Sequence, residues 1–290
     1  MKITNIGIMS MGDMGSGVAK ILKKNGFNVL TSLENRSKDS VIRAKQNKIK
    51  DVGNLGNLVE NSEVILSILV PSKALDFAKQ IAPFISKSKQ EKIFVDCNAI
   101  SPNTTKKINI FIEKSNGIFI DGGIIGGSPR SGEKPRIYLS GKNAYKIRIL
   151  NSKEVEFIDI NSEIGAASGL KMTYAAITKG TAALYAASLM TADHFGLLEK
   201  LLDEISYSQP KVFDSIKSVN SISAKAFRWI GEMEEIAETF SSTNNTDKFH
   251  MGAADIFRKI ASSSIGHERV DNIDKNRKLI ETIKLLNAKK

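Results

Sequence analysis

The chain has 290 residues, 41% hydrophobic and 25% charged, which is enough for one large globular domain or two moderate ones. Its net charge is +11, but the lysines are scattered without interleaved aromatic residues, which favours a basic surface that attracts anionic small molecules over a nucleic-acid interface. No apolar run reaches the ~20 residues of a membrane span, no signal peptide is expected and Cys97 has no disulfide partner, so we expect a cytoplasmic protein without nucleic-acid or membrane partners.

Residues 3–34 predict a strand, a glycine turn, a helix and a second strand. The first strand covers residues 3–9, the helix runs over 15–24 to Asn25-Gly26, and the second strand covers 29–33. The intervening SMGDMG differs from G-x-G-x-x-G only at its first position, where a small serine fits a tight turn. We therefore predict a dinucleotide diphosphate loop made of Ser10, Met11, Gly12, Asp13, Met14 and Gly15.

The end of the second strand bears on the choice of cofactor. Glu34 follows the loop by about 20 residues, where an acid bonds the ribose 2′-hydroxyl of NAD. Asn35-Arg36-Ser37 comes next and resembles sequences that hold a 2′-phosphate. We predict NADP, through Arg36, with NAD as the alternative.

Short apolar runs alternate with amphipathic stretches up to about residue 160. Strands are predicted at 64–70, 93–96, 118–121, 136–140 and 155–158, with helices at 75–84 and from Pro102 to about Ser115, N-capped by Ser101. This alternation predicts an α/β Rossmann-type, doubly wound parallel sheet. Val70 and Pro71 close a strand at the ligand-binding edge, so we add them to the cofactor contacts, and residues 122–127 are expected to form a glycine-rich loop.

Residues 163–195 form a proline-free stretch with small residues on every face, which predicts one helix ~50 Å long. All later patterns are helical. We expect a dinucleotide-binding domain at 1–162 and an all-α domain at 163–290, joined by this long interdomain helix. His194 and His250 stand alone, so we expect no metal site.

Four segments resemble motifs of the β-hydroxyacid dehydrogenases, the superfamily that includes 6-phosphogluconate dehydrogenase and 3-hydroxyisobutyrate dehydrogenase. They are SMGDMG at 10–15, VDCNAISP at 95–102, DGGIIGG at 121–127 and GAASGLKM at 165–172. The resemblance covers the whole chain, and the segments GLKMTYAAITKG and RWIGEMEEI look like a divergent branch with a variant helical C-terminal domain.

The chain departs from the superfamily's motifs at four positions. Ser10 replaces the first glycine, Asn98 replaces a serine, Ile125 replaces the substrate-contacting serine and Ala175 replaces an asparagine. These departures leave a second hypothesis open, a non-catalytic dinucleotide-binding sensor or scaffold.

The resemblance implies hydride transfer between a nicotinamide and a small β-hydroxy acid or its keto form, in a homodimer that pairs through its helical domains. It makes Lys171 the general acid or base. From the residues alone, a lysine that interrupts a small, apolar helix is either such a base or a surface lysine whose charged end reaches water. It also implies a small anionic substrate held by the loop residues Gly123, Ile125, Gly126 and Gly127.

Three further polar residues complete the predicted site. Tyr174 and Thr178 follow Lys171 on the same side of the helix and would replace the missing asparagine; ordinary packing is the alternative for both. Asn98 lies just beyond a strand end and is predicted to bond the nicotinamide or the substrate, or else to shape the turn before Pro102. We assign Lys171, Asn98 and Tyr174 to catalysis, and Thr178 to substrate binding.

Overall fold

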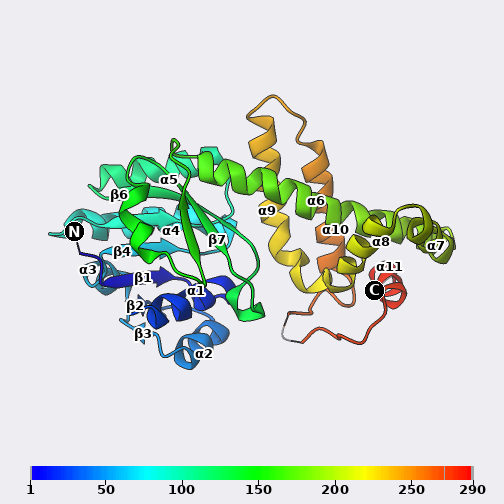
Figure 1. The fold of residues 1–290 in the computed structure, drawn as a ribbon, viewed down its shortest axis with the longest axis horizontal. Coiled ribbons are helices and arrows are strands. Elements are labelled where there is room, and N and C mark those ends of the chain that lie inside the picture. The colour runs from blue at the N-terminus through cyan, green and yellow to red at the C-terminus, as the bar shows by residue number, and fades with distance from the viewer. Residues whose placement is uncertain (1, 271, 289–290) are drawn as a thin grey trace. The chain divides into compact units, whose positions relative to one another are not determined.

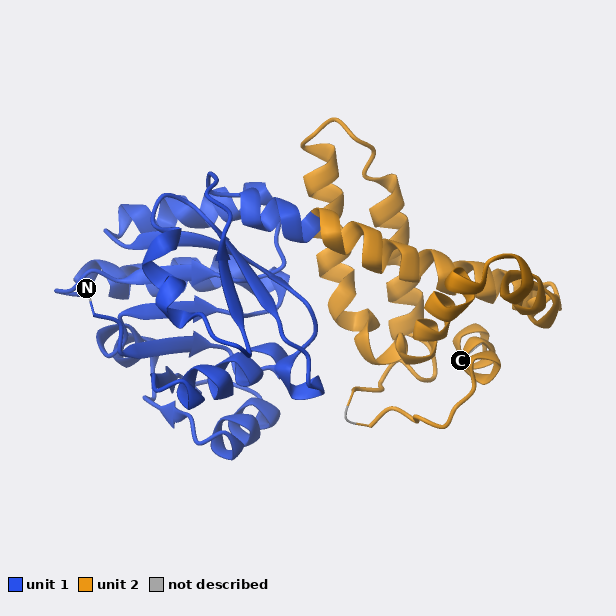
Figure 2. Ribbon diagram, viewed as in Figure 1, with its two compact units in different colours: residues 1–172 blue, residues 173–290 orange. Residues whose placement is uncertain are grey.

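The structure is a computed structural model that describes residues 2–270 and 272–288. The chain divides into two compact units, residues 1–172 and 173–290 (Figure 2). The division falls inside helix α6 (Ala166–His194), whereas the sequence placed the domain boundary before that helix, near residue 162.

Unit 1 is a Rossmann-type α/β fold around an eight-stranded sheet with the order β3-β2-β1-β4-β5-β6-β7-β8 (Figure 1). The predicted doubly wound sheet is confirmed, with one correction: β6 and β7 pair antiparallel, and the other neighbours pair parallel. Only a short connection separates β6 from β7, which suits an antiparallel return. The strands are β1 Asn5–Met9, β2 Asn28–Thr31, β3 Lys50–Asp51, β4 Val64–Ser67, β5 Ile93–Asp96, β6 Ile118–Ile125, β7 Arg136–Ser140 and β8 Glu156–Asp159.

The helices of unit 1 begin at the signals that the sequence offers. Ser101 caps its helix by accepting a hydrogen bond from the Thr104 amide, as predicted, and Ser37 does the same for the Ser40 amide. Pro71 occupies the first turn of a helix that is longer than the predicted 75–84. The helices are α1 Asp13–Lys24, α2 Lys38–Gln46, α3 Leu55–Glu60, α4 Pro71–Lys87 and α5 Pro102–Lys114.

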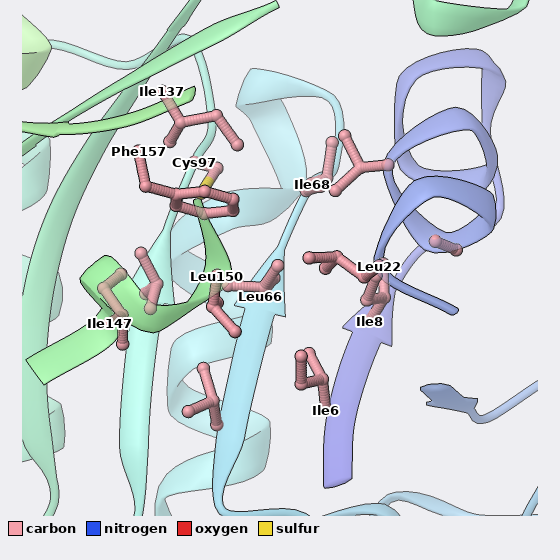
Figure 3. Packing of buried hydrophobic residues seen from close by; sticks show 14 of the residues in the cluster. Ile6, Ile8, Leu22, Leu66, Ile68, Cys97, Ile137, Ile147, Leu150 and Phe157 are labelled. Atoms are coloured by element: carbon pink, nitrogen blue, oxygen red, sulfur yellow. The ribbon is translucent and has the colours of Figure 1, made fainter. Parts of the chain in front are cut away.

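The sheet is buried on both faces. Along β4, Val64 and Leu66 belong to one hydrophobic cluster and Ile65 to another on the opposite face. Figure 3 shows the first cluster, in which Ile8 of β1 and Leu22 of α1 meet. Because both faces are filled with apolar side chains, polar groups that handle a ligand are left to the strand ends.

Strand β6 corrects a second expectation. The sequence predicted that the strand ends at Asp121 and that a loop follows, but β6 continues to Ile125. Pairing with β7 extends it, because Asp121 faces Ser140 and Ile125 faces Arg136 across the ladder. Side chains alternate along a strand, so Asp121, Gly123 and Ile125 share one face of β6.

Unit 2 consists of helices in the part of the chain that the structure describes. Helices α9 (Ser223–Ser241) and α10 (Lys248–Ala261) form an antiparallel hairpin, since Trp229 packs on Phe257 and Phe240 on His250. Figure 1 shows these two helices side by side. The others are α7 Leu198–Ser208, α8 Pro210–Ile216 and α11 Leu279–Asn287. None of the described helices combines the length and apolar character that crossing a membrane requires.

A buried ion pair ties the segment after α10 to the start of α9. The Arg277 guanidinium donates to both Glu268 oxygens at 2.7 Å, and Ser223 Oγ donates to the same carboxylate at 2.5 Å. Burial would raise the pKa of Glu268, but the hydrogen bonds from Arg277 and Ser223 outweigh it and lower the pKa. A lowered pKa means that the carboxylate's stabilisation is complete above the unfolded pKa and is lost as pH falls through the folded one.

We therefore expect Glu268→Gln to destabilise the protein by about 3 kcal/mol at pH 7, because it leaves a buried guanidinium without its carboxylate. Below the unfolded glutamate pKa of about 4.3 the gap between wild type and variant should shrink, since acid neutralises the wild-type carboxylate too. Urea unfolding of wild type and variant between pH 3.5 and pH 7 measures the loss of stability at pH 7 and its decrease in acid. A gap that stays constant over this range would show that the charge of Glu268 contributes nothing.

Candidate cofactor and catalytic site

The N-terminus of α1 is built to approach a ligand. Its N-cap, Gly12, has no side chain to cap the helix, and a Cβ added there would meet only Ser10 Oγ, at 3.8 Å. At Gly15 an added Cβ would lie 1.9 Å from the Ser10 carbonyl oxygen, so this glycine is required by packing. The uncapped amides and positive end of this helix suit a diphosphate.

Ser10 fits the place of the missing glycine. It does not figure among the described residues with a left-handed backbone, so the turn does not demand glycine there. Met11 is 1% exposed, and Met14 packs against the same core cluster. The side chains of these two methionines therefore pack against the core under the loop. The predicted contacts of Met11 and Met14 with a cofactor would have to be made by their backbone atoms.

The segment that follows β6 is docked on the first two turns of α1. Ser128 Oγ donates to the Asp13 carbonyl at 3.1 Å, and Arg130 Nη1 lies 2.9 Å from Asp13 Oδ1. A Cβ on Gly17 would lie 2.9 Å from Pro129, so only glycine admits this contact. Sequence reasoning missed Gly17; its signal was a glycine inside a helix, where it costs about 1 kcal/mol against alanine.

The end of β2 carries the groups that were predicted to choose the cofactor. Glu34 is exposed and Asn35 has a left-handed φ of 56°. Arg36 is half-buried, and its Nε is buried with no hydrogen-bond partner among the described residues. A buried guanidinium nitrogen without an acceptor is suited to an anionic ligand.

Asn98 joins the ends of β4 and β5. Its Nδ2 donates to Ser67 Oγ at 2.9 Å and to Asp96 Oδ2 at 2.8 Å, and its Oδ1 accepts from the Leu69 amide. Both amide hydrogens are thus used inside unit 1, and the residue is 1% exposed. This geometry matches the turn-shaping alternative; a direct contact with cofactor or substrate stays a prediction.

Val70 and Pro71 mark the start of α4, just beyond the end of β4. Val70 is its N-cap and is 46% exposed. An exposed apolar side chain at the carboxyl edge of the sheet can pack against a flat ring of the cofactor. The exposure of Val70 is therefore compatible with its predicted cofactor contact.

Lys171 and Gly123 are brought together within unit 1. A Cβ on Gly123 would lie 2.5 Å from the Ala167 carbonyl oxygen and 3.0 Å from Lys171 Cβ, so the first turns of α6 lie directly on β6. Strands β4 and β5 end level with Asp121, so Gly123 lies beyond them, at the ligand-binding edge of the sheet. Lys171 is half-buried there.

The other predicted substrate contacts are placed as follows. Ile125 is buried at 4% exposure at the end of β6. Gly126 has a left-handed φ of 112°, and the Gly127 amide donates to Glu133 Oε2 at 2.7 Å. The remaining two belong to unit 2: Tyr174 is 42% exposed, and Thr178 Oγ1 donates to the Tyr174 carbonyl at 3.1 Å.

Sequence comparison identifies the first unit. Residues 5–149 match the family described as the NAD binding domain of 6-phosphogluconate dehydrogenase, and residues 192–260 match a domain of unknown function, DUF1932. An uncharacterized 28.5 kDa protein from the 7S RNA 5′ region of Methanothermus fervidus is 33% identical over 208 residues, 72% of this chain and 78% of that protein.

Two solved structures extend the likeness to both units. A conserved protein of unknown function, itself described as structurally similar to 3-hydroxyacid dehydrogenases, is 29% identical with a TM-score of 0.65, covering 89% of this chain and 96% of its own. The 3-hydroxyisobutyrate dehydrogenase of Mycobacterium tuberculosis with L-serine has a TM-score of 0.72 at 15% identity, covering 99% and 100% of the two chains. The second likeness concerns the fold.

Proposed function

Because this chain belongs to the 6-phosphogluconate dehydrogenase-like family of NAD-binding proteins, within the β-hydroxyacid dehydrogenase superfamily, we propose that it is an NAD(P)-dependent oxidoreductase. Its substrate would be a small β-hydroxy acid or the corresponding keto acid. The observation that carries this proposal is the meeting of Lys171 with Gly123 at the edge of the sheet that also holds the N-terminus of α1.

The described residues fit a nicotinamide dinucleotide. An added Cβ at Gly12 would meet only Ser10 Oγ, at 3.8 Å, and the helix has no side-chain cap. Gly12 and its neighbours would hold the diphosphate, and Arg36 would take an anionic group on the ribose. When bound, the nicotinamide supplies the hydride acceptor or donor.

The chain's own contribution is proton handling and orientation. Lys171 Nζ would take the proton of the substrate hydroxyl during oxidation and return it to the carbonyl oxygen during reduction. Segment 126–133, which Ser128 and Arg130 hold against Asp13 of α1, would orient the acid group. The Gly127 amide already donates to Glu133, so other backbone amides at the end of β6 would bind the acid. Gly123 itself is buried where the first turns of α6 pack on β6.

The test is a screen of hydroxy acids and keto acids with NAD and NADP, following the absorbance of the reduced nicotinamide. Turnover of at least one small acid is expected. Binding of a coenzyme without turnover of any acid in the screen would instead support the sensor or scaffold hypothesis, which the replacements Ile125 and Ala175 motivate.

For the cofactor we propose NADP, on the unpartnered Nε of Arg36. Arg36→Leu should weaken NADP binding about tenfold or more and leave NAD binding within about threefold, because a charge-assisted hydrogen bond to a phosphate is worth about 1.5–3 kcal/mol. Calorimetric titration with both coenzymes measures this. Lys45→Leu, which removes one positive charge from an exposed position on α2, is the control. Equal losses for both coenzymes would assign Arg36 to folding rather than to selection.

A further inference from the structure

The start of helix α6 is held by a carboxylate from the middle of strand β6. Asp121 Oδ2 accepts from the Gly165 amide at 2.9 Å and from the Ser168 amide at 3.1 Å, and Asp121 Oδ1 accepts from Ser168 Oγ at 2.5 Å. Ser140 Oγ donates to the same carboxylate at 2.8 Å and accepts from the Ala167 amide at 3.1 Å. Asp121 is fully buried.

This network satisfies the whole N-terminus of the helix. The residue before Ala166 is Gly165, which has a φ of 101° and no side chain to cap the first turn. The Gly165 and Ser168 amides reach Asp121, the Ala167 amide reaches Ser140, and the Ala166 amide reaches the Glu163 carbonyl. Asp121 therefore acts as the N-cap of a helix that begins 45 residues later in the chain.

The same strand face provides the second fixed point of α6. Asp121 and Gly123 lie two residues apart on one face of β6, and Gly123 admits the Ala167 carbonyl and Lys171 Cβ in close contact. The cap fixes the position of the first turn of α6 and its rotation about the helix axis. Because Lys171 lies about one turn beyond Ser168, the cap also fixes where Lys171 begins. A shift of about 1 Å at a catalytic group is enough to lower turnover about a hundredfold.

We propose that Asp121 is a positioning residue, which fixes the start of α6 and thereby places Lys171 over Gly123 for proton transfer. This inference rests on the proposed function of Lys171. Burial raises the pKa of Asp121, and the hydrogen bonds from Ser168, Ser140 and Gly165 oppose that rise. The role requires an acceptor at this place rather than a charge, because each of its bonds is accepted from a neutral donor.

Two substitutions of Asp121 distinguish its role as a hydrogen-bond acceptor from a role of its charge. In Asp121→Asn the amide oxygen can still accept from the two backbone amides and Ser140, while the new NH2 donates to Ser168 Oγ, whose hydroxyl then turns to Thr105 Oγ1, 2.8 Å away. Asp121→Ala removes the cap outright. We expect kcat to fall at least tenfold in Asp121→Ala with the KM for the coenzyme within twofold, and Asp121→Asn to keep at least a third of wild-type kcat.

Hydrogen exchange of the peptide spanning residues 164–172 is read in parallel and needs no turnover. It should quicken at least tenfold in Asp121→Ala and stay near wild type in Asp121→Asn. Lys92→Met is the control, since Lys92 is equally buried but donates to the Ser62 carbonyl at the opposite, amino end of β5. That variant should lose stability without slowing turnover or loosening the start of α6.

The outcomes separate this inference from the proposed function. If wild type turns over no acid, the proposed function fails. Independently of turnover, unchanged hydrogen exchange in Asp121→Ala would overturn the cap. Equal kcat losses in Asp121→Asn and Asp121→Ala would replace the cap with a role for charge. If Asp121→Ala does not fold, Ser168→Ala decides: it keeps the backbone amide but loses the hydroxyl bond, and unchanged exchange and kcat there would contradict the proposal.

Discussion

Lys171→Ala should abolish most of the turnover while leaving coenzyme binding intact. General acid or base catalysis contributes about 10²- to 10⁴-fold, so kcat should fall within that range. The side chain starts at the β6 face beside Gly123, and the predicted coenzyme contacts are all made by other residues of unit 1. Steady-state kinetics on the best acid of the screen, together with calorimetric titration of the coenzyme, measures both quantities.

An exposed lysine on α5 serves as the matched control. Lys107→Ala removes the same charge from the same unit and should change kcat by less than twofold. Lys171→Arg should remain impaired, because a planar, permanently charged guanidinium cannot exchange a proton near neutral pH. Turnover in Lys171→Ala within threefold of wild type would remove this lysine from the mechanism and return attention to Tyr174.

The parts of the fold that depend on neighbours in sequence were predictable. The run from β1 through α1 to β2 follows from local signals: an apolar strand, a glycine turn, a helical period and the stop at Asn25-Gly26. Ser101 capping α5 is a contact three residues away and was correctly predicted. The helix of 163–195 was predicted from composition alone and is found as Ala166–His194.

The features that the sequence did not reveal depend on distant partners. Gly122 and Gly123 favour a loop by local preference, but they become strand because β7 supplies the ladder partners. The cap on α6 joins Asp121, Ser140 and Ser168, which lie far apart in the chain. A single sequence contains no local signal for such a network, so Asp121 read only as the end of a strand.

The candidate site shows the same division. The positions of Gly12 and Gly15 follow from the motif, and the structure gives each a physical reason. Asn98, in contrast, was predicted either to contact a ligand or to shape the turn before Pro102, and the structure adds that its amide hydrogens are engaged by Ser67 and Asp96. Whether a polar side chain faces a ligand or its own protein depends on neighbouring strands, which periodicity does not identify.

Gly15→Ala should damage both the fold and coenzyme binding. The added Cβ would stand 1.9 Å from the Ser10 carbonyl oxygen, a backbone atom that cannot move aside without shifting the loop. Overpacking of this kind costs about 1–3 kcal/mol of stability. To relieve the clash, the first turn of α1 must move away from the Ser10 carbonyl, which distorts the loop that would hold the diphosphate. Affinities for NAD and NADP should both fall at least tenfold, measured by calorimetric titration alongside urea unfolding.

Two variants separate the clash from a general effect of substitution in a helix. Gly252→Ala in α10 meets nothing within 4 Å and should gain up to about 1 kcal/mol of stability with unchanged coenzyme affinity. Ser10→Gly restores the usual motif and should bind coenzyme within threefold of wild type, since Ser10 Oγ stands 3.8 Å from the space above Gly12. Wild-type affinity in Gly15→Ala would instead mean that the diphosphate lies elsewhere, because no dinucleotide could hold this loop while its helix is displaced.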